Sequence, residues 1–180
     1  VAVQRSGWSK QGGFEIYLMD ATKGAQLWNI VKEAGRPYDI GPGGPTTPER
    51  LESGLFSFGG DSDDKTNPFE VRLGKYINLN VPDEVVGITA LRRIAQEGPK
   101  RHQLGLKLEG DTPAPLGFAW EPIVVGGQKI GEMTTCGWSP RLRQNIGFAL
   151  ISRDIGVGQS VEIMRPKGPT RAEVVDLPFL

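Results

Sequence analysis

The chain has 180 residues, which is enough to bury one large core or two small ones. It carries 21 Lys and Arg residues against 21 Asp and Glu residues, so its formal charge is zero, and we expect neither a nucleic acid nor a membrane surface as partner. The single cysteine, Cys136, excludes an internal disulfide, and no Cys/His cluster offers a structural zinc or other metal site. Because there is no secretory leader and no apolar run of about 20 residues, we expect a soluble protein of the reducing cytoplasm.

The first strands are predicted over residues 1–5 and 14–19, with a glycine-rich loop between them. The chain opens VAVQRSG without Met, and Val1 and Val3 have the spacing of the inner face of a strand. We therefore expect an N-terminal half to be missing. In the second strand, alternation predicts Phe14, Ile16 and Leu18 in the core, with Glu15 and Tyr17 on the other face.

A helix is predicted over residues 21–35, with Asp20 as its cap and Gly35 at its end. Leu27, Trp28, Val31 and Ala34 recur at helical spacing. The loop that follows, RPYDIGPGGP, contains glycines, but Pro42 and Pro45 remove backbone donors and no Lys-Ser/Thr pair follows. A phosphate-binding P-loop is therefore excluded.

A short helix is predicted over residues 48–55, because Thr47-Pro48 is a strong helix start. The next segment, residues 57–67, reads as a solvated loop. Its three aspartates, Asp61, Asp63 and Asp64, suggest calcium, but an EF-hand counted from Asp61 needs Gly and Glu where this chain has Thr66 and Arg72. The loop is therefore predicted to hold no metal.

Two more helix starts precede the second half of the chain. Asn67-Pro68 begins one, with Glu70 placed to accept from the cap residue. The segment GITALRRIAQE, residues 87–97, is the other. Its apolar stripe consists of Ile88, Leu91, Ile94 and Ala95, and Gly98-Pro99 ends it.

From Lys100 onward, short alternating runs separated by Gly, Pro and Asp predict an antiparallel sheet or barrel of about five strands. The only histidine, His102, lies in such a run and is interpreted as an ordinary strand residue. The fold class is therefore α+β, with an N-terminal α/β part at residues 1–97, truncated at its N-terminus, and a C-terminal antiparallel β barrel at residues 100–180.

In chain order, seven segments resemble the glycine-cleavage T-protein family of folate-dependent one-carbon transferases. The segments are RSGWSKQGGFEIYL, LWNIVKEAG, ERLESG, NPFEVRLGKYI, GITALRRI, GQKIGEMTTCGWSPRLRQNIGFALI and VVDLPFL. The likeness covers essentially the whole chain, although Glu49 stands where the family usually has Leu. Trp8, in place of the usual tyrosine, and the string SKQGGFE look more like the dimethylsulfoniopropionate demethylases. The rival subclasses are true aminomethyltransferases and the folate domains of sarcosine or dimethylglycine dehydrogenases.

The resemblance implies that tetrahydrofolate is the cofactor and that Glu15 hydrogen-bonds its pterin. A carboxylate can accept two parallel N–H donors from the pterin edge, which is a strong arrangement. Tyr17 shares the face of Glu15, and Trp8 offers a flat surface for a ring. Arg50 matches a folate-contact arginine of the family; from the residues alone, a surface ion pair with Glu49 or Glu52 is the competing interpretation.

Trp138 and Arg141, near the Ser139-Pro140 turn, are the candidates to close the site from the barrel side, although packing at an interface explains a tryptophan equally well. The family's catalytic aspartate lies upstream of the matching segment, so no catalytic residue is predicted here and the fragment alone is expected to be inactive. The expected partners are a small one-carbon donor and the missing N-terminal half.

Two other functions remain open. Some relatives bind folate without catalysis and assist iron–sulfur assembly; they carry a cysteine signature, Lys-Gly-Cys-(Tyr/Phe)-x-Gly-Gln-Glu. The lone cysteine here lies in TTCGWSP instead, which counts against that function. The other alternative is an interaction module that uses the barrel as a scaffold.

Overall fold

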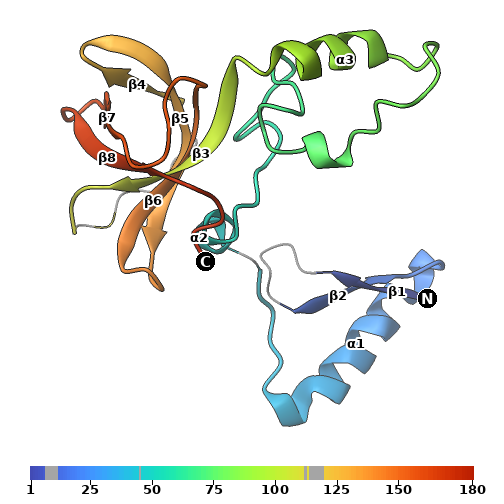
Figure 1. The fold of residues 1–180 in the computed structure, drawn as a ribbon. Helices are drawn as coiled ribbons and strands as arrows, with labels where there is room; N and C mark the ends of the chain where they lie inside the picture. The colour runs from blue at the N-terminus through green and yellow to red at the C-terminus, as the bar shows by residue number, and fades with distance from the viewer. Residues whose placement is uncertain (7–11, 45, 112, 114–119) are drawn as a thin grey trace. The chain divides into compact units, whose positions relative to one another are not determined.

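The computed structural model describes residues 1–6, 12–44, 46–111, 113 and 120–180. They form two compact units, Val1–Thr46 and Thr47–Leu180, whose elements are labelled in Figure 1. The division after Thr46 differs from the domain boundary expected near residues 97–101, which stays a prediction.

The first unit contains an antiparallel hairpin and a helix. Strands β1 (Ala2–Ser6) and β2 (Gly13–Tyr17) pair so that Gln4 lies opposite Glu15. A 3₁₀ turn at Ala21–Lys23 leads into α1 (Gly24–Gly35), and a second one follows at Arg36–Tyr38. The Asp20 carboxylate accepts the Thr22 N–H at 3.1 Å, as the predicted cap requires.

The apolar face of this hairpin is open. Val1, Val3, Phe14 and Ile16 are 72%, 61%, 72% and 42% exposed, and only Leu18 is half-buried. The prediction that these residues form a core is therefore wrong for the unit as described. The physical reason is that a two-stranded hairpin has no third layer of its own against which to bury an apolar face.

The second unit begins with the short helix α2 (Thr47–Glu52), close to where Thr47-Pro48 predicts it. Its last three residues, Arg50, Leu51 and Glu52, are all buried. Because two of them are charged, α2 must bring its ionic partners into the interior with it.

The expected helix at Asn67 is reduced to a single turn. The capping box forms, because Asn67 Oδ1 accepts the Glu70 N–H at 3.2 Å and Glu70 Oε2 accepts the Asn67 N–H at 3.1 Å. However, Arg72 then adopts a left-handed conformation, with φ of 64°, and the Leu73 N–H bonds the Pro68 carbonyl at 2.9 Å. That arrangement closes the turn, and only a 3₁₀ turn at Gly74–Tyr76 follows.

Helix α3 (Ile88–Glu97) has the predicted bounds within a residue. Ile88 is buried, and Leu91 and Ile94 are half-buried. Ala95 is exposed, so it does not belong to the buried face of the helix as predicted. Gly98 ends the helix at a φ of 79°, with its N–H bonded to the Ile94 carbonyl at 2.8 Å.

The remaining strands close into an antiparallel barrel in the order β3-β6-β5-β4-β7-β8 (Figure 1). Their bounds are β3 (Arg101–Leu108), β4 (Glu121–Val125), β5 (Gln128–Ser139), β6 (Gln144–Ser152), β7 (Ser160–Ile163) and β8 (Thr170–Val175). The barrel core is built from alternate residues of these strands, among them Leu106, Ile123, Ile151, Ile163 and Val174. The predicted barrel is confirmed.

The barrel has six strands, whereas the sequence predicted about five. The difference arises in the run PIVVGGQKIGEMTT, which folds back on itself at Gly126-Gly127 to give both β4 and β5. The φ angles of these glycines are 58° and 80°, the left-handed pair that a tight two-residue hairpin needs. His102 lies on β3, and its Nε2 is 2.8 Å from the Ile155 carbonyl oxygen, consistent with an ordinary strand residue.

Candidate functional site

Glu15 lies on the polar side of the hairpin in the first unit. The β1–β2 register sets it opposite Gln4 and on the same face as Ser6 and Tyr17. The Tyr17 hydroxyl donates a short hydrogen bond to Glu15 Oε2. The structure thus brings together two of the predicted site residues, Glu15 and Tyr17, on an open face of the hairpin.

The two side chains shift each other's ionisation. Hydrogen bonds from Tyr17, and secondarily from Ser6, hold the pKa of Glu15 below its ordinary value. The same bond to Glu15 raises the pKa of the Tyr17 phenol. At neutral pH, Glu15 is therefore an ionised acceptor and Tyr17 a neutral donor.

Trp8, the third site residue predicted in this region, lies outside the described residues. Its predicted stacking role stays a prediction.

Arg50 is buried in the second unit, 1% exposed, rather than at the surface. Its Nη1 donates to Asp61 Oδ2 at 2.7 Å and to the Leu55 carbonyl at 3.0 Å, and its Nη2 donates to Thr135 Oγ1 at 3.2 Å. Its guanidinium also lies 5.6 Å from the centre of the Phe148 ring. The competing interpretation, a surface ion pair with Glu49 or Glu52, is wrong in its location and in its partner.

Asp61 is the centre of this buried cluster. Its carboxylate accepts one hydrogen bond from Arg50 and one from the Ser57 N–H. It also accepts hydrogen bonds from the hydroxyls of Thr134 and Thr135 on β5. The prediction that residues 57–67 form a solvated loop is therefore wrong at Asp61 and Ser62, which are 1% and 3% exposed. The ion pair with Arg50 explains the burial, because a carboxylate enters the interior only with a partner.

Glu52 forms a second buried carboxylate cluster two residues farther along α2. Its Oε1 accepts from the Ser139 hydroxyl at 2.6 Å, whereas its Oε2 has no hydrogen-bond partner among the described residues and lies 3.5 Å from Arg141 Nε. The Arg141 side chain is 53% exposed, and Trp138, on β5, is half-buried. The Arg141 guanidinium is thus paired through Nε with the buried Glu52 carboxylate, while about half of the side chain is exposed to solvent.

Asp61, Glu52 and the Thr134-Thr135 pair were not predicted from the sequence as partners in buried clusters. The residues that bury them lie far apart in the chain, and the adjacent threonines on β5 are the one local sign of such contacts. These contacts attach α2 and the segment after it to the barrel, within the second unit.

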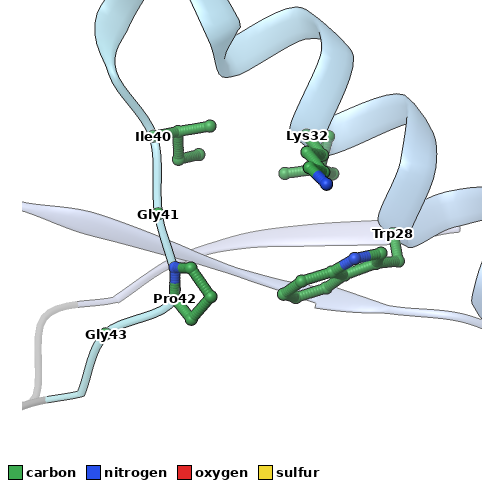
Figure 2. Close-up of a pocket in the computed structure, with 7 residues that line it drawn as sticks. Trp28, Lys32, Ile40, Gly41, Pro42 and Gly43 are labelled. Carbon is green, nitrogen blue, oxygen red and sulfur yellow. The ribbon is translucent and has the colours of Figure 1, made fainter.

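A separate pocket of about 350 Å³ lies in the first unit, between α1 and the glycine-proline loop that follows it. Figure 2 shows the Trp28 ring on one side and Pro42 on the other, with Lys32 above them. None of the predicted site residues that the structure describes lines this pocket. One wall of the pocket is formed by residues 40–43, which belong to the glycine-proline loop that was excluded as a P-loop.

In fold, the chain is similar to about half of a solved aminomethyltransferase structure. It superposes on the crystal structure of glycine cleavage system aminomethyltransferase T from Bartonella henselae with a TM-score of 0.78 and 24% sequence identity, over 99% of this chain and 49% of that one. This similarity shows the fold.

The family follows from the sequence comparisons. Residues 1–81 match the family model described as the GCVT N-terminal domain, and residues 101–180 match the glycine cleavage T-protein C-terminal barrel domain. The chain belongs to the glycine cleavage T-protein family, so the resemblance drawn from the seven segments is confirmed.

Individual relatives bear two different names. The chain is 37% identical over 169 residues to dimethylsulfoniopropionate demethylase DmdA of Ruegeria pomeroyi, covering 93% of this chain and 45% of the relative. It is 35% identical over 181 residues to an aminomethyltransferase of Prochlorococcus marinus, covering 99% and 46%. The chain therefore spans about half the length of the curated relatives it matches. Among the described residues, every helix is too short or too polar to cross a bilayer.

Proposed function

We propose that this chain is part of a tetrahydrofolate-dependent transferase of one-carbon units, either methyl or aminomethyl groups. Its membership of the T-protein family supports the reaction class. The observation that supports a specific binding residue is the ionised Glu15 on the open face of the hairpin. The Tyr17 hydroxyl beside it donates a hydrogen bond to its carboxylate.

The residues of the first unit fit a pterin. An exposed carboxylate whose pKa is lowered accepts N–H donors at neutral pH, and a pterin edge presents two such donors side by side. Tyr17 would orient Glu15 by donating to Oε2. When bound, tetrahydrofolate supplies the nitrogen that receives the one-carbon unit; the role of these side chains is to hold the ring in one orientation, so that proximity contributes to the rate.

Arg50 fits a ligand contact poorly. Its guanidinium donates to Asp61, the Leu55 carbonyl and Thr135, and it is 1% exposed. We infer that its main role is to attach α2 to the barrel. The remaining candidates for folate contacts are Trp8, Trp138 and Arg141. Of these, Arg141 carries a charge, and its side chain is about half exposed to solvent.

Among the members of the family, we propose a dimethylsulfoniopropionate demethylase. The stretch GWSKQGGFE supports this choice, as does the 37% identity to a relative of that name. The second candidate is an aminomethyltransferase, which several relatives at 33–36% identity favour. The context of Cys136 counts against a non-catalytic folate protein, and a cytoplasmic location stays a prediction.

An assay of donors separates the two candidates. The protein at full length, including the upstream half, is incubated with tetrahydrofolate and either dimethylsulfoniopropionate or a lipoyl-bound aminomethyl group. Methylated tetrahydrofolate formed from the sulfonium donor alone supports the demethylase. Turnover of the lipoyl donor alone would reassign the protein to the aminomethyltransferases, and turnover of neither would remove the proposal.

The role of Glu15 has its own test. In the full-length protein, Glu15→Ala should weaken tetrahydrofolate binding roughly 10- to 100-fold, the worth of hydrogen bonds to a charged group, as measured by isothermal titration. The matched control is Glu33→Ala, which removes an exposed carboxylate from α1. Equal affinities for the two variants would show that Glu15 does not contact the cofactor.

A further inference from the structure

A second cavity, of about 430 Å³, lies within the second unit, and none of the described folate-contact candidates lines it. It is bounded by the turn at residues 65–70, the last turn of α3, and residues 98–100 before β3. Its lining is of mixed polarity and includes three cationic side chains: Lys65, Arg93 and Lys100.

These three cations come from three separate segments, and all are exposed. Within the described part of the chain, no ion pair joins any of them to a carboxylate. The neighbouring arginines behave differently. Arg92 is held by Asp83 and by the carbonyls of Leu79 and Val81, and Arg101 is held by Glu70. Among the described residues, the three cations that line the cavity thus form no direct ion pair, although Asp63 lies close enough to Lys65 to offset part of its charge.

Two carboxylates also line the cavity, and they leave an excess of positive charge. Glu70 is neutralised by Arg101, whose Nε and Nη2 lie 2.9 Å and 3.2 Å from its two oxygens, and it also accepts the Asn67 N–H. Among the described lining residues, Glu97 then remains as the one carboxylate without an ion pair, against three cations. The partial negative charge at the C-terminal end of α3 is reduced as well, because Arg153 Nη1 donates to the Glu97 carbonyl at 3.2 Å.

We propose that this cavity binds a small anion that carries two or more negative charges, such as a phosphate or a polycarboxylate. Cations that converge on a concave surface concentrate positive potential, and an oxyanion offers each of them an acceptor. Because the cavity is larger than one phosphate group, it can accept the body of a small metabolite as well as its charged end. None of the described residues proposed as folate contacts lines this cavity.

The test uses the intact protein and two probes, inorganic phosphate and citrate, each titrated calorimetrically at low ionic strength. We expect saturable binding of at least one probe. Lys65→Gln, Arg93→Gln and Lys100→Gln should each weaken it about three- to tenfold, because each removes one nearby charge, and added salt should weaken it further. Lys75→Gln and Lys167→Gln are the matched controls, because they remove exposed charges outside the cavity.

Each outcome decides the proposal. Preferential binding of phosphate assigns the site to phosphorylated ligands, and preferential binding of citrate assigns it to carboxylates. Absence of saturable binding for both probes, or equal losses in the cavity variants and the controls, overturns the site. Circular dichroism of each variant verifies folding, and no folate enters the experiment, so its result stands apart from that of the proposed function.

Discussion

The two units place their carboxylates in opposite surroundings. In the first unit, Glu15 lies on an open hairpin face, where hydrogen bonds from Tyr17 and Ser6 lower its pKa. In the second, Asp61 and Glu52 are buried at 1% exposure and joined to Arg50, Ser139 and Arg141. The comparison shows that a carboxylate available to a ligand and a carboxylate that holds segments together are distinguished by burial and partner, not by residue type.

The largest effect is expected at Asp61. Asp61→Ala leaves the Arg50 guanidinium buried without its counter-charge, which should cost about 3–5 kcal/mol of unfolding free energy. Urea denaturation of the variant and of Asp64→Ala, which removes an exposed aspartate of the same loop, makes the measurement. Equal stabilities of the two variants would show that the buried ion pair does not hold this segment to the barrel.

A smaller effect is expected at Glu52. Glu52→Ala removes the acceptor of the Ser139 hydroxyl and should lower the free energy of unfolding by about 1–3 kcal/mol. Arg141→Ala should cost less than about 1 kcal/mol, because its side chain is half exposed. If the arginine variant is the less stable of the two, the ion pair rather than the serine contact dominates, and Arg141 belongs with the structural residues.

The smallest effect concerns the exposed carboxylate. Tyr17→Phe removes the main bond that lowers the pKa of Glu15, so that pKa should rise toward its ordinary value, as followed by carbon NMR of the side chain. In the native chain, the stabilising contribution of this bond is present above the ordinary glutamate pKa and is lost as the pH falls through the lowered one. Gln4→Ala, on the facing strand, is the control. An unchanged titration of Glu15 in Tyr17→Phe would contradict the assigned cause.

Local sequence signals predicted much of the fold. Asp20 and the Asn67–Glu70 box are caps written in a few adjacent residues, and the alternating runs after Lys100 indicated the barrel. The failures have two origins. The helix expected after Asn67 ends for a local reason, because Arg72 adopts a left-handed backbone. The burial of Asp61 is long-range, because it depends on Arg50 and on Thr134 and Thr135, and the two threonines lie more than seventy residues away.

The candidate site divides in the same way. The shared face of Glu15 and Tyr17 follows from strand alternation alone, and the structure adds their hydrogen bond. The position of Arg50 could not be predicted, because a charged residue on a short helix is exposed unless a distant partner covers it. The cavity that carries Lys65, Arg93 and Lys100 was also missed, since its three segments meet only in the folded chain.

Closure of the barrel has a consequence for how the chain is made. β3 pairs on one side with β6 and on the other with β8, so its second edge stays unsatisfied until Thr170–Val175 has been synthesised. Folding of the barrel must therefore wait until Thr170–Val175 has left the ribosome, and its rate is set by contacts between distant parts of the sequence. During translation, the edge formed by Gly105–Leu108 is a place where a chaperone can protect the nascent protein from pairing with a neighbour.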